Sequence, residues 1–164
     1  RGPSLFRAVI DQGQTRGVRH FLLGATEDTL AALREALHVH YPGATIAGSY
    51  APPFAPYSRE SIAEWCEVVR ESQADLVWVG LGTPKQDYAV NDLASELSRP
   101  CVAVGAAFDF VAGTVDEAPE RLHGSGLEWL YRLASEPRRL WRRYLFGNLA
   151  FLVLVLKNWR TDRP

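Results

Sequence analysis

The sequence predicts an α/β fold: a doubly wound, Rossmann-like parallel sheet with a C-terminal helical appendage. Short apolar runs alternate with amphipathic helical patterns of roughly 12–15 residues, and each apolar run ends in a glycine. The alternation stops after residue 116, and only helical patterns follow. We therefore divide the chain into a Rossmann-like domain over residues 1–125 and an appendage over residues 126–164.

The first strand and helix are predicted near the amino terminus. Residues 18–24 (VRHFLLG) form a short apolar run that ends in glycine, which is typical of a strand. Thr26 follows as a candidate N-cap, with Glu27 and Asp28 in the first turn of a helical pattern that continues to about residue 40. This order is that of a β-loop-α unit.

A second unit of the same kind follows. Residues 44–48 read as a strand, and a proline-rich loop over residues 51–56 (APPFAP) leads away from it. Ser58 is placed to cap a helix that runs to about residue 72.

The third strand is the most hydrophobic. Residues 75–80 (DLVWVG) are almost continuously apolar, as in a parallel sheet that is covered on both faces. The segment GLGTPKQD then opens a helix through about residue 97, and residues 100–105 form the fourth strand.

The appendage is predicted to hold two helices. The first covers residues 126–134, and the second runs from Ser135 as N-cap, with Pro137 in its first turn, to about residue 159. Its longest apolar stretch, residues 145–156, is about 12 residues long, whereas roughly 20 are needed to span a bilayer. We expect that the appendage does not cross the membrane.

The charge of the chain is unevenly distributed. Residues 1–125 hold 10 Lys and Arg against 16 Asp and Glu, whereas residues 126–164 hold 8 against 3. The basic residues of the appendage alternate with aromatic and aliphatic ones at helical spacing, which predicts a surface that can lie at an anionic membrane. The alternative is a helix that covers the sheet and turns a solvated arginine face outward. The apolar stretch at residues 145–156 would equally serve a homo-oligomeric interface.

Composition excludes several classes of protein. With 47% hydrophobic and 23% charged residues, the chain belongs to neither the disordered nor the membrane-spanning class. Its two cysteines form no CxxC pair, which favours a reducing compartment. The four histidines are scattered and complete no ligand set, so we expect surface histidines and no metal site.

The candidate binding site lies at the carboxyl ends of the strands, where ligands bind in open α/β sheets. The four strand ends are glycines: Gly24, Gly48, Gly80 and Gly105. After the third strand, Gly82 and Thr83 precede a helix whose free N–H groups would face a phosphate. Lys85 can neutralise phosphate charge and Gln86 can bond a sugar or phosphate oxygen. The alternative is that this segment serves only as a turn.

Two further positions could contact a ligand. Asp109 stands between Phe108 and Phe110 just past the fourth strand, where it would either accept hydrogen bonds from sugar hydroxyls or cap a following helix. Tyr50 and Phe54, after the second strand, would either stack on a base or pack in the core.

Three blocks of sequence resemble the WecG/TagA/CpsF glycosyltransferases: ADLVWVGLGTPKQDYAV (74–90), VAVGAAFDFVAGTVDEAP (102–119) and GLEWLYRLASEPRRLWRRYLFGNLAFL (126–152). FLLG (21–24) and IAGSYAPPF (46–54) also fit. The resemblance therefore covers nearly the whole chain.

The resemblance implies an activity. The family moves N-acetylmannosamine or a related hexose from a UDP-sugar to an undecaprenyl-diphosphate-linked sugar in cell-surface polysaccharide synthesis, with inversion and without a metal. Gln86 would lie near the donor diphosphate or sugar, Asp109 would border the donor, and the loop around Tyr50 would lie near the base. The tail would close over the cleft at the inner face of the cell membrane, and four of its arginines would bind the diphosphate: Arg132, Arg139, Arg142 and Arg143. We expect no nucleic-acid partner and no cofactor.

The chain departs from the family pattern in three places. Asp87 stands where the family often has Glu, and Glu117 where it commonly has a basic residue or Gln. The family's aspartate base lies in an amino-terminal segment that has no counterpart in residues 1–20. We therefore expect that the amino-terminal part is missing, that the catalytic base lies outside this chain, and that the chain alone has little or no transferase activity.

Two other classes compete with a transferase. The first is a non-catalytic nucleotide- or phosphate-binding α/β module or a degenerate relative, which would bind many nucleotides equally. The second is an NAD-dependent oxidoreductase, which lacks support because the third glycine of the dinucleotide fingerprint is absent.

Overall fold

The computed structural model describes residues 1–123, 125, 128–135 and 137. The chain divides into two compact units, Arg1–Val115 and Asp116–Pro164, which are described separately. The division predicted from the sequence, after residue 125, stays a prediction.

The first unit alternates strands and helices along the chain. Its elements are α1 (Gly2–Gly13), the 3₁₀ turn η1 (Gln14–Arg16), β1 (Arg19–Gly24), α2 (Glu27–His40), β2 (Thr45–Tyr50), α3 (Arg59–Ser72), β3 (Leu76–Gly80), α4 (Lys85–Leu97), β4 (Cys101–Ala103) and α5 (Ala107–Val111).

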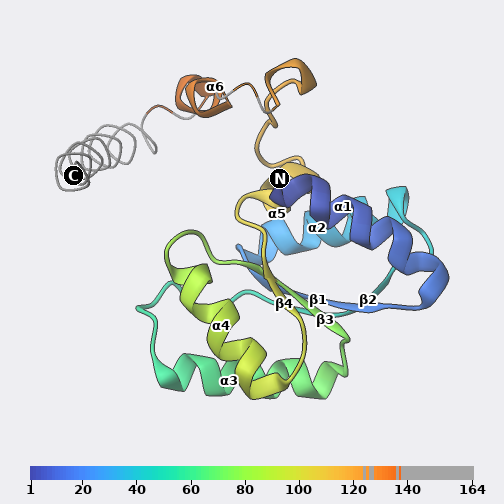
Figure 1. The fold of residues 1–164 in the computed structure, drawn as a ribbon, viewed down its shortest axis with the longest axis vertical. Helices are drawn as coiled ribbons and strands as arrows, with labels where there is room; N and C mark the ends of the chain where they lie inside the picture. The colour runs from blue at the N-terminus through green and yellow to red at the C-terminus, as the bar shows by residue number, and fades with distance from the viewer. Residues whose placement is uncertain (124, 126–127, 136, 138–164) are drawn as a thin grey trace, which may run out of the picture. The chain divides into compact units, whose positions relative to one another are not determined.

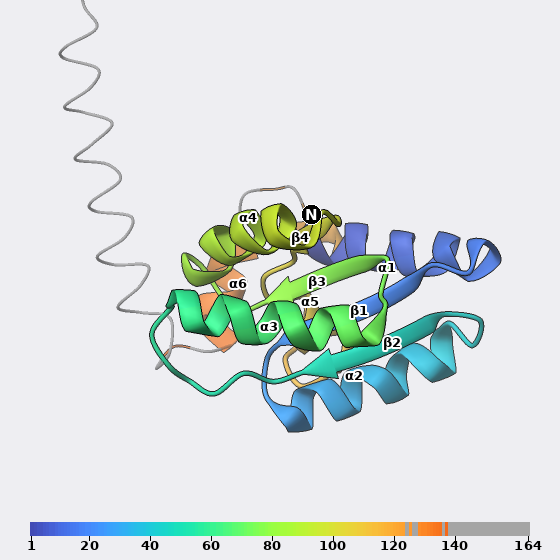
Figure 2. The same cartoon turned by 90° about the horizontal axis from the view of Figure 1, so that it is seen from below.

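The four strands form one parallel sheet in the order β2-β1-β3-β4. Helices α3 and α4 cover one face, and α1 and α2 cover the other (Figure 1; Figure 2). This arrangement confirms the predicted doubly wound α/β fold. The chain places β2 on one side of β1 and then β3 on the other side, so the direction of winding reverses between β1 and β3.

Each sheet face has its own apolar core. The face under α3 and α4 buries one set of side chains: Phe21, Leu23, Ile62, Trp65, Cys66, Val69, Ala74, Val77, Val79, Ala89, Leu93 and Leu97. The opposite face buries another set: Phe6, Ile10, Leu22, Leu30, Leu33, Leu37, Trp78, Val104, Ala107 and Phe108. Because successive strand residues point to opposite faces, β1 and β3 supply both cores.

Two predicted helix caps are confirmed. The Thr26 hydroxyl accepts a hydrogen bond from the backbone N–H of Thr29 at 3.2 Å, and the Ser58 hydroxyl accepts one from Ser61 at the same distance. These bonds satisfy N–H groups that the first turn of a helix leaves unpaired.

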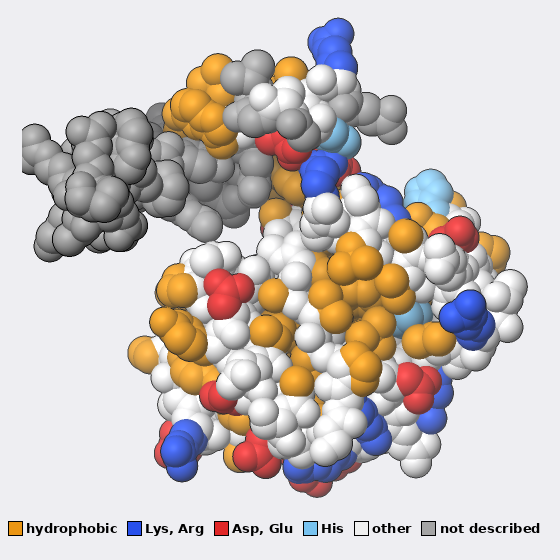
Figure 3. Space-filling model, in the orientation of Figure 1, with side chains coloured by type: hydrophobic (Ala, Val, Ile, Leu, Met, Phe, Trp, Pro, Cys, Tyr) orange, Lys and Arg blue, Asp and Glu red, His pale blue; other side chains and the backbone are white. Residues whose placement is uncertain are grey.

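The first helix, α1, was not predicted from the sequence. Phe6 and Ile10 lie one turn apart and are fully buried, and the Phe6 ring meets Trp78 edge-on at 4.9 Å between centroids. Leu5 remains 48% exposed on its outer side. Figure 3 shows apolar side chains gathered on the face of the molecule that carries α1.

The expectation that the histidines lie at the surface is wrong for His20. Its side chain is fully buried, and its Nδ1 accepts a hydrogen bond from Trp78 Nε1 at 3.2 Å. Burial lowers the pKa of His20, and Asp75 partly opposes this shift. His20 therefore serves the core of the sheet.

The second unit holds the 3₁₀ turn η2 (Glu120–Leu122) and α6 (Glu128–Ser135). Helix α6 overlaps the first appendage helix predicted over residues 126–134 and extends beyond it to Ser135. Ser135, predicted as the N-cap of the second helix, lies within α6, and its hydroxyl donates a hydrogen bond to the Tyr131 carbonyl at 3.0 Å. The second predicted helix, the apolar stretch at residues 145–156, and Arg139, Arg142 and Arg143 lie outside the described residues. Among the residues that are described, no helix is long and apolar enough to cross a membrane.

Candidate nucleotide-binding pocket

A pocket of about 630 Å³ opens at the carboxyl ends of β1 and β3. In open α/β sheets the reversal of winding leaves a crevice at this point, because the loops after the two strands turn to opposite faces. Three loops line the pocket with these residues: Ala25, Thr26, Glu27, Ala51, Pro52, Pro53, Phe54, Ala55, Gly80, Leu81, Gly82, Thr83 and Lys85.

The floor of the pocket is a close contact between two strand ends. Gly24 pairs with Gly80 in the sheet, and the next amide, of Ala25, donates to the Gly80 carbonyl at 3.1 Å. A Cβ atom at Gly24 would lie 2.6 Å from the Gly80 carbonyl oxygen, and the Gly24 φ of +119° is itself unfavourable for any side chain. Glycine at these strand ends therefore permits the approach of β1 to β3.

Two helices begin at the pocket, and their first turns differ. Helix α2 starts with its Thr26 cap and with the carboxylates of Glu27 and Asp28. Helix α4 starts after Gly82, Thr83 and Pro84 without a side-chain cap and with one carboxylate, Asp87, in its first turn. Because α2 carries a side-chain cap and two carboxylates at its start, the amino terminus of α4 is the better position for an anionic group of a ligand.

Gln86 lies in the first turn of α4 and is only 6% exposed. Its Nε2 is 3.4 Å from the Thr83 hydroxyl, while its Oε1 has no hydrogen-bond partner among the described residues. A Cβ added at Gly105 would lie 3.9 Å from Nε2, so the segment that follows β4 also approaches this amide. Leaving a buried amide oxygen unpaired costs roughly 1–3 kcal/mol, which makes Gln86 a candidate ligand contact.

Lys85 has protein partners of its own. Its Nζ donates to the backbone carbonyl of Ala55 at 2.9 Å and lies 5.4 Å from the centre of the Trp65 ring. The lysine thus joins the start of α4 to the proline-rich loop on the other side of the pocket.

Phe54, which the sequence suggested as either a stacking or a core residue, and Glu27, which it placed only in the first turn of a helix, both line the pocket. The Phe54 ring is fully exposed to solvent. Glu27 brings a carboxylate to the pocket from the start of α2. A proline-rich loop after one strand and an acidic helix start after another are the sequence signals for these two residues.

Tyr50 and Phe108 are not brought to the pocket. The Tyr50 hydroxyl donates to the Glu64 carboxylate on α3, a bond that raises the pKa of Tyr50. Phe108 is 1% exposed and packs against Phe6 at 5.6 Å between ring centroids, and a Cβ at Gly80 would lie 2.7 Å from its ring. Phe108 therefore belongs to the core, which accounts for the small residue at Gly80.

Asp109 and the predicted arginines occupy other positions. Asp109 lies inside the short helix α5 and does not line the pocket, and its backbone carbonyl accepts hydrogen bonds from Thr114 and Val115. It therefore does not cap a following helix. Arg132 falls within α6, in the second unit.

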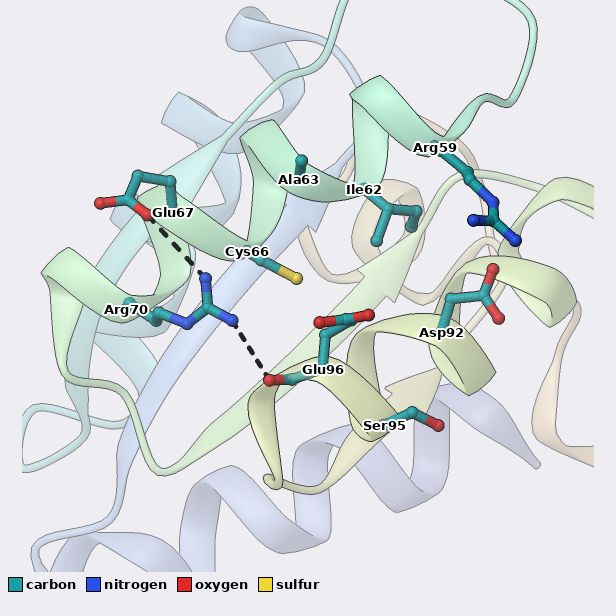
Figure 4. A pocket seen from close by; sticks show the side chains of 9 residues that line it. All are labelled: Arg59, Ile62, Ala63, Cys66, Glu67, Arg70, Asp92, Ser95 and Glu96. Atoms are coloured by element: carbon teal, nitrogen blue, oxygen red, sulfur yellow. Dashed lines mark hydrogen bonds and ion pairs between the residues drawn. The ribbon is translucent and has the colours of Figure 1, made fainter.

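A second pocket, of about 510 Å³, lies between α3 and α4 (Figure 4). Arg70 lies 3.9 Å from Glu67 and donates to the Glu96 carbonyl at 3.2 Å. Asp92 accepts a hydrogen bond from the Tyr57 hydroxyl. Because its lining carries charges of both signs, this groove has no clear preference for a charged ligand. In the described part of the chain, no cluster of three His, Cys, Asp or Glu side chains could hold a metal.

Comparison with known proteins decides the family. The model of the glycosyl transferase WecG/TagA/CpsF family matches residues 1–164. The chain belongs to this family. It is also similar to the N-acetylglucosaminyldiphosphoundecaprenol N-acetyl-beta-D-mannosaminyltransferase of Bacillus spizizenii, with 32% identity over 162 residues.

That match covers 98% of this chain and 60% of the relative. The chain thus spans about 60% of the length of this relative. The pocket at the carboxyl ends of β1 and β3 lies where ligands bind in open α/β sheets.

Proposed function

We propose that this chain supplies the donor-binding part of a hexosyltransferase of the WecG/TagA/CpsF type. The reaction would move an N-acetylmannosamine-type sugar or related hexose from a UDP-sugar to an undecaprenyl-diphosphate-linked sugar, with inversion, in cell-surface polysaccharide synthesis. Family membership and the name of the Bacillus relative support this proposal. The observation that carries it is the buried, unpaired amide oxygen of Gln86 beside the uncapped start of α4.

The residues that line the pocket, together with Gln86 behind Thr83, fit the parts of a UDP-sugar. The diphosphate would lie at the amino terminus of α4, where Gly82 has no side chain to hinder its approach and the Thr83 hydroxyl can donate a hydrogen bond. The Gln86 amide would reach the sugar or the diphosphate. The exposed ring of Phe54 offers a flat surface for the base, and the Glu27 carboxylate can accept hydrogen bonds from hydroxyls.

In the chemical step, the acceptor hydroxyl attacks the anomeric carbon, loses its proton to a base, and displaces UDP. We assign the described residues to the leaving-group side of this step. The positive end of the α4 dipole, the Thr83 hydroxyl and the Gln86 amide would stabilise the negative charge that develops on the departing diphosphate.

Calorimetric titration tests the proposal. UDP should bind more tightly than ADP or GDP, and Gln86→Leu should weaken UDP binding roughly 5-fold or more, because it removes the amide. Gln12→Leu, at an exposed position of α1, is the matched control and should leave UDP binding unchanged. Equal binding of all three nucleotides would instead favour a generic, non-catalytic nucleotide-binding module.

We also propose that the protein works at the inner face of the cell membrane, where a polyprenyl-linked acceptor resides. The basic composition of residues 126–164 supports this, and α6 exposes Trp129 at 42% and Leu130 at 50%. In a flotation assay with anionic vesicles at low salt, the chain should float with the vesicles. A chain that lacks residues 136–164 should float less, and equal behaviour of the two would contradict the proposal.

A further inference from the structure

The proline-rich loop between β2 and α3 forms one wall of the pocket. Residues 51–55 of this loop line the pocket, and residues 53–56 are exposed to solvent. Pro52, Pro53 and Pro56 have no backbone N–H, so the loop has few donors with which to fix itself to the sheet.

Lys85, which lies outside this loop at the start of α4, donates a hydrogen bond to it. Its bond to the Ala55 carbonyl is the only hydrogen bond between the backbone of residues 52–56 and another described residue. The ammonium group also lies over the Trp65 ring, at 5.4 Å from its centre, and the Trp65 side chain is 2% exposed in the core beneath α3. The lysine is therefore held between a rigid ring and the loop carbonyl.

The bond from Lys85 to Ala55 connects two segments that line the pocket. Lys85 is the first residue of α4, directly after the Gly82-Thr83-Pro84 turn that forms the other wall of the pocket. One side chain thus joins the two walls. Phe54 is adjacent to the anchored carbonyl, so the same bond restrains the backbone that carries its exposed ring.

We propose that Lys85 is a positioning residue: it anchors the 51–56 loop across the pocket and acts on nucleotide binding through that loop. The nucleotide part of this inference rests on the proposed function. An alternative role for Lys85 is direct neutralisation of a phosphate. The two roles differ in what they predict for the nucleotide-free protein, because a phosphate contact has no effect on the loop when no phosphate is bound.

Backbone order parameters from NMR relaxation, measured without nucleotide, test the anchor directly. In Lys85→Met the order parameters of Phe54 and Ala55 should fall from about 0.85 to about 0.6 or below. Lys85→Arg, which retains a donor and a cation for the ring, should restore them. Arg16→Met, which removes a solvent-exposed cation on η1, is the control and should change neither value.

Binding of UMP and UDP then tests the consequence. A displaced wall should weaken both nucleotides by a similar factor, about 5-fold or more, in Lys85→Met. Unchanged order parameters, a loss confined to UDP, or a mobile loop with unchanged affinities would each overturn the inference. If the unaltered protein binds neither nucleotide, the proposed function fails, while the order parameters still decide whether Lys85 anchors the loop.

Discussion

The Ala25 amide donates to the Gly80 carbonyl at 3.1 Å, and this bond joins the carboxyl ends of β1 and β3 at the floor of the pocket. Ala25 itself has a φ of +60°, a conformation that is uncommon for alanine. Strain of this kind persists where the surrounding structure fixes the backbone, and it is concentrated at functional sites. The strand pair therefore holds both pocket loops in place.

Gly24→Ala should disrupt this floor. The new Cβ would lie 2.6 Å from the Gly80 carbonyl carbon and oxygen, which are backbone atoms that cannot move aside as a side chain would. We expect the free energy of unfolding to fall by more than about 2 kcal/mol and UDP binding to weaken. Urea denaturation and calorimetry measure the two effects.

Gly82→Ala is the matched control for Gly24→Ala. Gly82 has a φ of +75°, but an added Cβ would meet nothing within 4 Å. Only the backbone conformation opposes the substitution, at a cost of about 1–2 kcal/mol. An equal loss of stability in the two variants would show that the close approach at Gly24 does not contribute to the destabilisation.

Phe54→Ala should weaken UDP binding without lowering the stability of the fold. The ring is fully exposed, so its removal should change the free energy of unfolding by less than about 0.5 kcal/mol. Loss of a stacking surface should weaken UDP binding roughly 5-fold or more. Val39→Ala, which removes an apolar side chain that is 63% exposed on α2, should affect neither quantity. If Phe54→Ala binds UDP with unchanged affinity, Phe54 is not part of the binding site.

His20→Asn should reduce the loss of stability in mild acid. Because burial lowers the pKa of His20 below its usual 6.5, its neutral form stabilises the fold above that pH, and this contribution is lost as pH falls. Asn can still accept the Trp78 hydrogen bond but does not titrate. Urea denaturation at pH 7 and pH 5 should show a smaller decrease for the variant, by at most about 1.4 kcal/mol per pH unit. An identical pH dependence in the unaltered protein and the variant would show that protonation of His20 does not cause the loss of stability.

Ser58→Ala should lower the free energy of unfolding by about 1 kcal/mol, because it removes the N-cap of α3. Ser58→Asp supplies another capping oxygen and should retain most of the stability. Thermal denaturation of the two variants checks the difference. A cap that matters only locally should also leave UDP affinity unchanged.

Local sequence patterns predicted most of the helices and strands but neither α1 nor the short helix α5. Thr26 and Ser58 each precede a helix and cap it, so both starts could be recognised. Helix α1 begins at Gly2 without a side-chain cap, and its burial depends on Phe6 meeting Trp78, which is 72 positions away from Phe6 in the chain. Contacts between such distant residues leave no mark in a local window.

The candidate site shows the same limit. Gly80, Gly82, Thr83 and Lys85 were expected at the pocket and line it. Tyr50 was expected there as well, but its hydroxyl turns toward Glu64. Whether an aromatic residue faces the pocket or the core depends on the face of the sheet on which it lies, and a single residue shift reverses that face.

The sequence by itself determined the alternation of strands and helices, the glycines at the strand ends and two helix caps, because each depends on the conformational preferences of neighbouring residues. Only the tertiary structure decided the strand order β2-β1-β3-β4, and with it the three loops that share one pocket. It also decided that the Gln86 oxygen is buried without a partner and that Lys85 reaches Ala55. These features arise from packing between segments that are far apart in the chain, so no local pattern records them.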